Sequence, residues 1–473
     1  MLVPVTTVPG VLGGTIDLQF STQQNAQLAT QLLREVYAAA GAGILDVENT
    51  PTKPPLGSGD LAEFTIGDQG GIQNSGPNAA TVPSGYTFII DAFADAPATV
   101  TGAPNQLNEA VLAGQGGLTF FTNGGSGTVL AGGGNNLVAP GPGAPDAASS
   151  WTLVFDGGSN TVSGPVGNLF IDDGSSSVAG TNQIFLGAGA DTVLSWGIDL
   201  IVAAPGGNAL IDVYHAGTRV YGNSGSLEVL NLGGEDTVVQ GGGPATMFAG
   251  ATGGLYFGGG GTLTFLAAPN TDSTVVAGAG GGTYYADGSN DLFFVGGGQF
   301  QLDGGSGQQT VVGTAGLSGS ALIFAGNGGS AVLFGNTEGN VLVAGAGNAT
   351  LNAGGASGGE TFFAGTGDDL IVGSSGTNFI QAGPGSDTLV GGAGVNLFQV
   401  GRSEAGGGSE LIVNWNRADQ LYLPGYGAAR AHGLPQGAAI TVVKGSAVLA
   451  LPDGTQITFL GISKVHAAQI HSS

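Results

Sequence analysis

The sequence predicts an all-β protein whose main part is a parallel β-solenoid (a β-roll), in which short strands wind into stacked coils. Three observations predict this fold: 95 glycines among 473 residues, a hydrophobic content of 41%, and a nine-residue repeat through most of the chain. Disordered glycine-rich chains are poor in large apolar residues. Glycine at this density beside ample Val, Ile, Leu and Phe therefore indicates turns repeated around a packed interior.

The nine-residue period is clearest between residues 364 and 399, which divide into AGTGDDLIV, GSSGTNFIQ, AGPGSDTLV and GGAGVNLFQ. Glycine fills the fourth place of each block, Asp or Asn the sixth, and an apolar residue the eighth. Uninterrupted blocks also fill residues 222–266, 277–312 and 113–139. An apolar eighth place recurs in every block, which indicates one structural unit repeated along the chain.

These blocks resemble the GGxGxDxUx nonapeptide of the RTX (repeats-in-toxin) proteins. The resemblance covers residues 113–399 and is most specific in 364–399, because the sixth-place Asp is often missing elsewhere. It implies that the glycines supply positive φ angles in tight turns, that places seven to nine form a strand, and that the side chain at place eight points inward. Two blocks make one coil, so residues 18 apart are expected to stack roughly 4.8 Å from each other.

The resemblance also implies calcium sites between successive turns, with the sixth-place carboxylates and the carbonyl groups of the glycine turns as ligands. Asp369 and Asp387 stand 18 residues apart on one edge. Two carboxylates at this separation repel by about 3 kcal/mol at an effective dielectric of 20, and a bound Ca²⁺ would convert the repulsion into a link between coils. The predicted calcium-binding residues are Asp369, Asp387, Gly365, Gly367, Gly383 and Gly385.

Other sixth-place residues have different neighbours. Three further aspartates are candidate metal ligands: Asp191, Asp236 and Asp291. The residues one coil away from them are neutral, which favours a role in forming the turn over a role in binding calcium. On the opposite edge, four residues form one column: Asn340, Glu360, Asn378 and Asn396. Stacked amides can hydrogen-bond along the axis without a metal, so we expect coil stacking to rest mainly on the core and on amide ladders.

The repeats are flanked by two regions that leave the nine-residue period. Residues 1–112 are predicted to be an N-terminal cap or assembly region, residues 113–399 the solenoid, and residues 400–473 a C-terminal cap. In the first region, a helix is expected over Thr22–Ala40, with Ser21 and Gln24 as a capping box.

The C-terminal region is similar to the segments that close RTX rolls, at residues 410–423 and 451–461. In that family the uncleaved C-terminus is the type I secretion signal. The N-terminus lacks the basic start and apolar core of a cleavable signal peptide. The resemblance thus implies an extracellular or bacterial cell-surface location.

Composition argues against several functions. With 33 acidic and 8 basic residues the net charge is −25, which disfavours nucleic acid as a partner. No cysteine is present, no stretch is apolar enough for a membrane span, and no HExxH motif occurs. The one GxSxG string, at residues 355–359, lies within the repeats and lacks a strand–turn–helix context. We therefore expect no enzymatic activity.

Place nine should point outward, yet it is often a large apolar residue: Phe121, Phe185, Phe248, Phe257, Phe294, Phe324, Phe334 and Phe363. Either a terminal segment of the chain covers this face, or other protomers pack on it. The leading hypothesis is a secreted structural protein that binds calcium and self-assembles into a fibre, surface layer or matrix. The alternatives are a monomeric calcium-binding adhesive module that recognises a surface, such as a cell-surface polysaccharide, and a solenoid enzyme that acts on polysaccharide.

Overall fold

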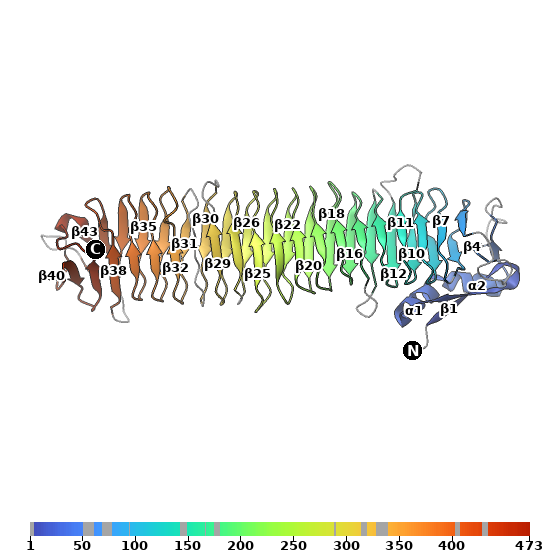
Figure 1. Ribbon diagram of the computed structural model, residues 1–473, viewed down its shortest axis with the longest axis horizontal. Helices are drawn as coiled ribbons and strands as arrows, with labels where there is room; N and C mark the ends of the chain where they lie inside the picture. The colour runs from blue at the N-terminus through green and yellow to red at the C-terminus, as the bar shows by residue number, and fades with distance from the viewer. Residues whose placement is uncertain are drawn as a thin grey trace. The chain divides into compact units, whose positions relative to one another are not determined.

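The computed structural model describes residues 4–50, 61–68, 78–93, 95–141, 149–165, 167–174, 180–287, 290–313, 319–327, 339–402, 407–427 and 434–473. It contains two compact units, Met1–Pro244 and Ala245–Ser473. Each unit consists mainly of short strands that pair in parallel with strands of the next coil (Figure 1). The predicted all-β parallel solenoid is therefore confirmed.

In unit 1 the coils have two parallel sheets. The first sheet contains β3 (Leu45–Glu48), β4 (Leu61–Ile66), β6 (Phe88–Asp91), β8 (Glu109–Ala113), β10 (Ser126–Ala131), β12 (Ser150–Phe155), β14 (Asn168–Asp172), β16 (Ala190–Ser195), β18 (Asn208–Val213) and β20 (Leu227–Asn231). The second contains β5 (Ala79–Thr81), β7 (Ala98–Thr101), β9 (Leu118–Phe121), β11 (Leu137–Ala139), β13 (Thr161–Ser163), β15 (Gln183–Phe185), β17 (Leu200–Val202), β19 (Arg219–Tyr221) and β21 (Asp236–Val239).

Unit 2 has three sheets. The first contains β22 (Ala245–Phe248), β24 (Leu263–Leu266), β26 (Gly282–Tyr285), β28 (Phe300–Asp303), β30 (Ala321–Phe324), β31 (Val341–Val343), β33 (Thr361–Phe363), β35 (Asn378–Gln381), β37 (Asn396–Gln399), β39 (Gln420–Leu423) and β43 (Ile470–Ser472). The second contains β23 (Gly254–Phe257), β25 (Ser273–Val276), β27 (Leu292–Val295) and β29 (Thr310–Gly313). The third, in spatial order, contains β32 (Thr350–Asn352), β34 (Leu370–Val372), β36 (Thr388–Val390), β38 (Ser409–Val413), β42 (Gln456–Phe459), β41 (Ser446–Ala450) and β40 (Ala439–Val443).

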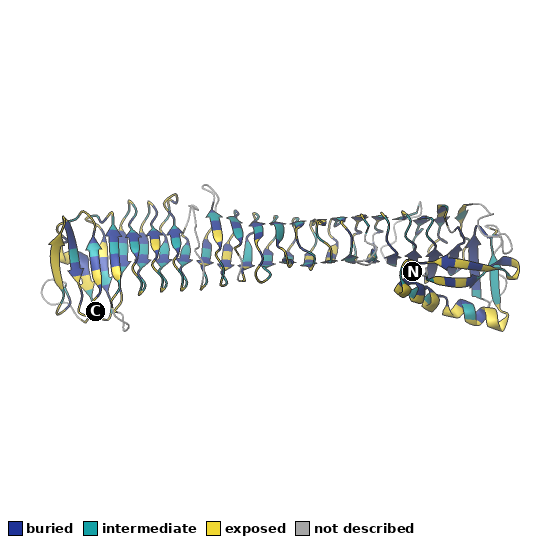
Figure 2. Cartoon of the chain, turned by 60° about the horizontal axis from the view of Figure 1, so that its bottom comes forward, coloured by how far each residue is buried: buried dark blue, intermediate teal, exposed yellow. Residues whose placement is uncertain are grey.

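The length of a coil follows from the repeat. Phe379 pairs with Leu397, and Leu370 with Thr388, so two blocks of nine make one coil as predicted. The place-eight side chains of these coils are fully buried: Ile371, Ile380, Leu389 and Phe398. Figure 2 shows the resulting alternation of buried and less buried positions along the strands. The inward direction of place eight is therefore confirmed.

The N-terminal segment covers the outer face of the first sheet at the start of unit 1. β1 (Val5–Pro9) and β2 (Thr15–Gln19) form a hairpin around the short 3-10 turn η1 (Val11–Gly13), and α1 (Gln23–Leu32) and α2 (Arg34–Ala42) follow. One buried cluster joins this segment to the outward side chains of the coils: Val8, Phe20, Ala29, Val36, Ile90, Leu112, Leu130 and Val154.

The single helix predicted over Thr22–Ala40 is wrong in two respects. The helix is interrupted at Leu33, whose backbone angles (φ −85°, ψ 5°) leave the helical region. The N-cap is Thr22 and not Ser21, because the Ser21 N–H donates to the carboxylate of Asp156 in a solenoid turn. A contact with the solenoid thus shifts the start of the helix by one residue.

The C-terminal region ends the third sheet with a hairpin. β38 and β39 correspond to the strand-like segments predicted within residues 410–423. β42 lies within residues 451–461 and pairs antiparallel with β41, which pairs antiparallel with β40. The terminal hairpin expected from the sequence is therefore present.

Candidate calcium-binding turns

Three carboxylates line one edge of the third sheet in unit 2. Asp369 and Asp387 directly precede β34 and β36, and the register of these strands places the two residues in adjacent coils. Thr388 pairs with Leu411, so Glu410 of β38 is next in the column. The sequence did not predict Glu410, because this residue follows Asp387 by 23 residues and no longer falls at the sixth place of the nine-residue repeat.

Each of the two aspartates joins its own turn to the preceding coil. Asp369 accepts hydrogen bonds from the N–H groups of Ala349 (2.8 Å) and Gly365 (2.7 Å). Asp387 accepts them from Asp369 (3.0 Å) and Gly383 (2.9 Å). Backbone amides of this kind stabilise the ionised carboxylate. The two side chains therefore face the turn and the neighbouring coil, and both are buried.

Burial sets the electrostatics of this column. Loss of hydration raises the pKa of Asp369, and it raises the pKa of Asp387 to about 6 although the backbone N–H groups act in the opposite direction. Burial, with the charge of Asp387 as a second cause, raises the pKa of Glu410 to about 9. A nearby cation would lower all three pKa values, because it favours the ionised forms.

The turn glycines are required for a different reason from the one predicted. None of Gly365, Gly367, Gly383 and Gly385 has a positive φ, so that expectation is wrong for these four residues. A Cβ atom at Gly383 would instead overlap the carbonyl oxygen of Gly365, and one at Gly385 would overlap that of Gly367. The glycines therefore permit the backbones of successive turns to stack closely, which brings their carbonyl groups to the same edge as the aspartates.

The residues at this edge fit a calcium ion. Both carboxylate oxygens of Glu410 are buried, and the backbone N–H of Asp387 lies close enough to favour the ionised form. Carboxylate and carbonyl oxygens are the ligands that Ca²⁺ prefers. The described part of the chain contains no group of three acidic, histidine or cysteine side chains placed to hold a metal together. A calcium ion here would therefore need backbone carbonyls in addition to carboxylates of neighbouring coils.

Comparison with known families bears on this stretch. Residues 354–389 and 363–398 match the model of the RTX calcium-binding nonapeptide repeat (4 copies). The matched stretch includes Asp369, Asp387 and the four turn glycines. RTX nonapeptide repeats bind calcium. No curated protein matches the chain.

On the opposite edge of the RTX stretch, amide side chains form the predicted ladder. Asn378 pairs with Asn396, and its side-chain N–H donates to the Asn396 side-chain oxygen at 2.8 Å. The Asn378 oxygen accepts from the Glu360 N–H (3.3 Å), and the Glu360 carboxylate accepts from the Asn340 N–H (2.5 Å). The column continues to Asp419, which accepts from the Asn396 N–H at 2.8 Å. These coils are thus held together by side chains on both edges.

Each of the three other candidate aspartates accepts a hydrogen bond from a backbone N–H group of the preceding coil. Asp191, Asp236 and Asp291 accept hydrogen bonds from the N–H groups of Leu169 (2.9 Å), Thr218 (2.6 Å) and Ser273 (2.8 Å), respectively. All three side chains are buried. Burial raises the pKa values of Asp191 and Asp236 to about 6. No second carboxylate precedes any of them at the position one coil back.

Sequence reasoning also missed a buried carboxyl pair in unit 1. Asn182 donates one side-chain hydrogen bond to Asp173 (2.9 Å) and one to Asp199 (2.8 Å). Burial, and then the Asp199 carboxylate, raise the pKa of Asp173 well above its usual range. Asp173 follows a strand at place one of its block, where the nine-residue pattern gives no signal, whereas Asp199 directly precedes β17 at a sixth place.

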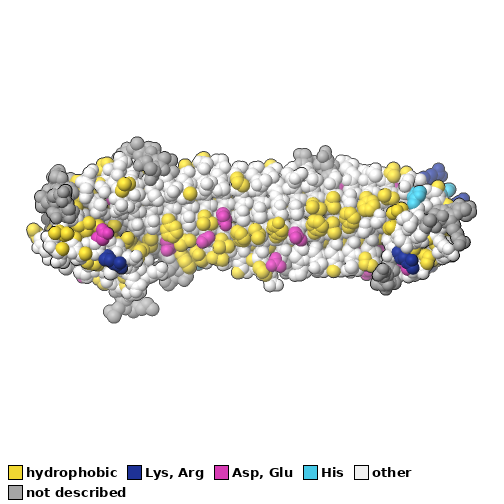
Figure 3. Space-filling model, turned by 180° about the vertical axis from the view of Figure 1, so that it is seen from behind, with side chains coloured by type: hydrophobic (Ala, Val, Ile, Leu, Met, Phe, Trp, Pro, Cys, Tyr) yellow, Lys and Arg dark blue, Asp and Glu magenta, His cyan; other side chains and the backbone are white. Residues whose placement is uncertain are grey.

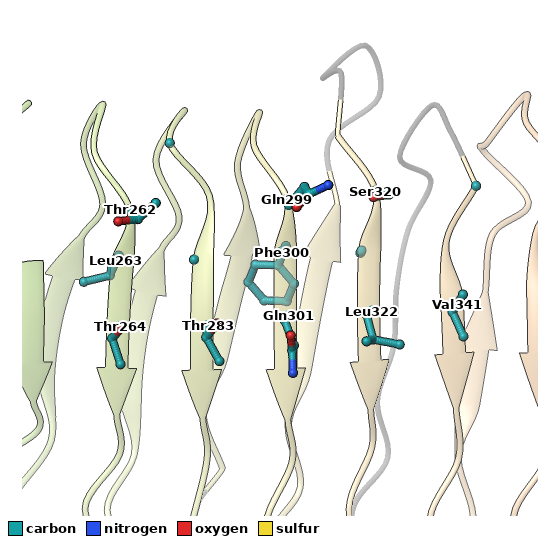
Figure 4. Close-up of a pocket in the computed structure, with 14 residues that line it drawn as sticks. Thr262, Leu263, Thr264, Thr283, Gln299, Phe300, Gln301, Ser320, Leu322 and Val341 are labelled. Atoms are coloured by element: carbon teal, nitrogen blue, oxygen red, sulfur yellow. The ribbon is translucent and has the colours of Figure 1, made fainter. Parts of the chain in front are cut away.

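One groove lies on the first sheet of unit 2 (Figure 4). Its volume is about 460 Å³, and outward-facing side chains such as Thr264, Thr283 and Gln301 line it. The described lining contains no acidic, basic or histidine side chain. The GxSxG string at 355–359 lies between β32 and β33, and no helix follows it. Neither feature supplies the acid–base groups that glycoside hydrolysis uses.

Proposed function

We propose that this chain is a secreted structural protein that binds calcium in its RTX turns and self-assembles into an extracellular fibre, surface layer or matrix. The observation that supports it best is the apolar outer surface of the coils. Phe185 and Tyr221 in unit 1, and Tyr285 and Phe324 in unit 2, each expose 38–44% of their surface. Contiguous exposed apolar side chains are typical of interaction surfaces.

The apolar residues form bands along the sheets and are not scattered singly. In unit 2, place nine of the second sheet reads Phe257, Val276, Phe294 and Val312 in successive coils. Figure 3 shows hydrophobic side chains gathered into such a band, with acidic side chains beside it. Of the eight predicted outward phenylalanines, seven are exposed or half-buried, and Phe334 lies outside the described residues.

The N-terminal segment of the chain covers only part of the apolar outer surface of the coils. The buried cluster under the N-terminal segment reaches outward side chains of the coils as far as Val154 in β12. Beyond it, Phe170 of β14 and Leu210 of β18 are exposed on the same sheet. We infer that further copies of the chain cover the later coils.

Within this proposal, calcium links the RTX coils. Asp369 and Asp387 supply carboxylates from adjacent turns, Gly365, Gly367, Gly383 and Gly385 supply carbonyl groups, and Glu410 adds a third carboxylate to the column. The bound ion supplies the positive charge that allows these buried carboxyl groups to ionise. Asp191, Asp236 and Asp291 act mainly as ladder residues, since each bonds a backbone N–H of the coil before it and has no carboxylate there.

The remaining parts of the proposal concern organisation and location. Residues 1–112 serve as a cap or assembly region, 113–399 as the solenoid, and 400–473 as a C-terminal cap that carries the type I secretion signal. The RTX stretch and the C-terminal hairpin support export from the cell. No helix in the described ranges is long and apolar enough to cross a membrane. We propose no catalytic role: the groove on the first sheet of unit 2 has no acid–base side chain in its described lining, and the carboxyl groups of Glu35, Glu109 and Asp199 that line two other grooves are not assigned a reaction.

Electron microscopy of the purified full chain in millimolar calcium tests the proposal. We expect ordered fibres or sheets that grow with protein concentration. As a matched variant, Tyr285→Thr and Phe324→Thr together should reduce lateral contacts, while threonine retains a high preference for strands. Monodisperse single particles of the wild type at high concentration would contradict self-assembly.

A further inference from the structure

We propose that copies of this chain associate head to tail, with the edge strand β40 of one copy docked against the N-terminal end of the next. The inference rests on the self-assembly proposed above and names the two surfaces that join. The N-end patch consists of Leu12, Ile44 and strand β3. The C-end patch consists of strand β40 and Lys444.

Leu12 is the first feature of the N-end patch. It is 95% exposed, and its backbone lies in the left-handed region (φ 54°, ψ 25°), which is unfavourable for leucine. The loop that carries it is fixed: the Val11 N–H donates to the buried carboxylate of Asp68 at 2.7 Å, and the Gly10 N–H donates to the Gly14 carbonyl at 2.8 Å. Strain of this kind persists where the surroundings enforce it, which points to a function for the exposed side chain.

Strand β3 lies beside this loop. The turn η1 contacts β3, and β3 pairs with β4 alone among the described strands. Ile44 directly precedes it and is also exposed. Asp46 and Glu48 give the strand two negative charges. A strand with one partner among the described strands, exposed apolar side chains and negative charge therefore occur together at the start of unit 1.

The C-end patch has the complementary features. All five residues of β40 are exposed, and among the described strands β40 pairs only with β41. Ile440, Val442 and Val443 present large apolar side chains to solvent. An uncharged, apolar edge strand is a template for pairing with another strand. Lys444 follows it directly in the turn and is positively charged.

The net charges of the two terminal regions favour the N-end patch of a second copy as the partner of the C-end patch. Residues 1–112 contain 2 basic and 10 acidic residues, a net charge of −8, whereas residues 400–473 contain 5 basic and 4 acidic residues, a net charge of +1. Of the three regions, 1–112, 113–399 and 400–473, only the C-terminal one does not have a negative net charge. Pairing of β40 with β3 brings Lys444 toward Asp46 and Glu48, whereas pairing of β40 with a second β40 brings no opposite charges together. A contact between two different surfaces leaves one patch unused at each end of the assembly, so it extends into a filament unless the rotation between copies closes a ring.

Two single variants test the two patches separately. Leu12→Asn removes the exposed apolar side chain and relieves backbone strain, because asparagine tolerates the left-handed region. Val442→Lys places a charge on the edge strand, a device that blocks strand pairing. Both positions are exposed, so both variants should fold. We expect each to weaken association in calcium, measured by sedimentation velocity, by about tenfold or more, as for a central interface residue.

Mixing the two variants gives the decisive result. Each has one intact patch, so in the Tyr285→Thr, Phe324→Thr background, where lateral contacts are weakened, an equimolar mixture should form heterodimers that do not grow into filaments. Leu232→Asn is the control, because Leu232 is also exposed (47%, against 95% for Leu12) but directly follows β20, in neither patch. This control should assemble like the wild type.

The other outcomes overturn the proposal in distinguishable ways. If Val442→Lys is monomeric but Leu12→Asn still dimerises, the contact is tail to tail. If all variants assemble like the wild type, the ends play no part, although self-assembly stands. If the wild type is itself monomeric, the proposed function fails together with this inference.

Discussion

At the scale of single residues, the sixth-place side chain decides whether an RTX-like coil needs a cation. Aspartate and asparagine make the same structural hydrogen bond here, since the side-chain oxygen of each accepts from a backbone N–H one coil earlier. They differ in charge. The Asp369–Asp387 edge therefore carries a buried repulsion that the Asn378–Asn396 edge avoids. We therefore propose that the aspartate edge responds to calcium and that the asparagine edge does not need it.

Replacing Asp369 and Asp387 together by asparagine should separate these two roles. The backbone hydrogen bonds can remain, so the calcium-free variant should melt at the same temperature as the wild type or a few degrees higher. Calcium should no longer raise its melting temperature, and titration calorimetry should show a lower calcium stoichiometry. The control is Asn378→Ala with Asn396→Ala, which changes the other edge of the same coils and should leave the stoichiometry intact. Unchanged calcium binding in the Asp369→Asn, Asp387→Asn variant would refute the site.

The sequence predicted part of this site, and the missing part has a physical cause. Asp369, Asp387 and the Asn378–Asn396 ladder follow directly from the spacing of 18 residues. Glu410 does not, because an insertion before β38 breaks the period and only strand pairing restores its place in the column. A sequence period predicts which residues stack in adjacent coils only as long as every coil has the same length. After an irregular turn, the period no longer predicts these neighbours.

At the scale of secondary-structure elements, the turns depend on close backbone stacking more than on backbone angles. Gly383 and Gly385 lie against the carbonyl groups of the preceding turn, and their φ angles are outside the left-handed region. A glycine-rich sequence alone does not distinguish these two requirements. The same limit applies to the N-terminal helices, where Asp156, from a distant solenoid turn, takes the Ser21 N–H.

A pair of glycine variants tests the stacking requirement. Gly383→Ala would place a methyl group against the Gly365 carbonyl oxygen, so that the turns must separate. We expect a loss of about 1–3 kcal/mol in the free energy of unfolding, as for overpacked sites, measured by urea denaturation with calcium present. Gly401→Ala is the matched control, because a Cβ atom at this position would have no neighbouring atom within 4 Å. Equal effects of the two substitutions would show that close stacking is not the reason for glycine at 383.

At the scale of the whole molecule, buried carboxyl groups recur along the chain. Burial raises the pKa of Glu63 to about 8, of Asp91 to about 7 and of Glu109 to about 8. These three residues lie in unit 1, outside the RTX stretch. Their folded forms therefore hold protons at pH values where the unfolded chain has released them. The net charge of −25, counted with every carboxyl group ionised, overstates the charge of the folded protein near neutral pH.

This proton uptake predicts how stability varies with pH. Because the folded pKa of Glu63 is raised from 4.5 to about 8, its contribution to stability is complete below pH 4.5 and is lost as the pH rises to about 8. Each pKa unit corresponds to about 1.4 kcal/mol, so the calcium-free protein should be more stable at pH 5 than at pH 8 by several kcal/mol. The measurement is urea denaturation across this range in the presence of a chelator.

The Glu63→Gln variant measures how much of this decrease in stability with pH comes from one residue. Glu63 is fully buried under the N-terminal segment, and its two carboxylate oxygens have no hydrogen-bond partner among the described residues. Glutamine is similar in shape but does not ionise, so the free energy of unfolding should fall less between pH 5 and pH 8 than in the wild type. Glu35→Gln, at an exposed position of α2, should leave the slope unchanged. If the slope is the same in all three proteins, Glu63 is not protonated in the fold, and a counter-charge must exist beside it.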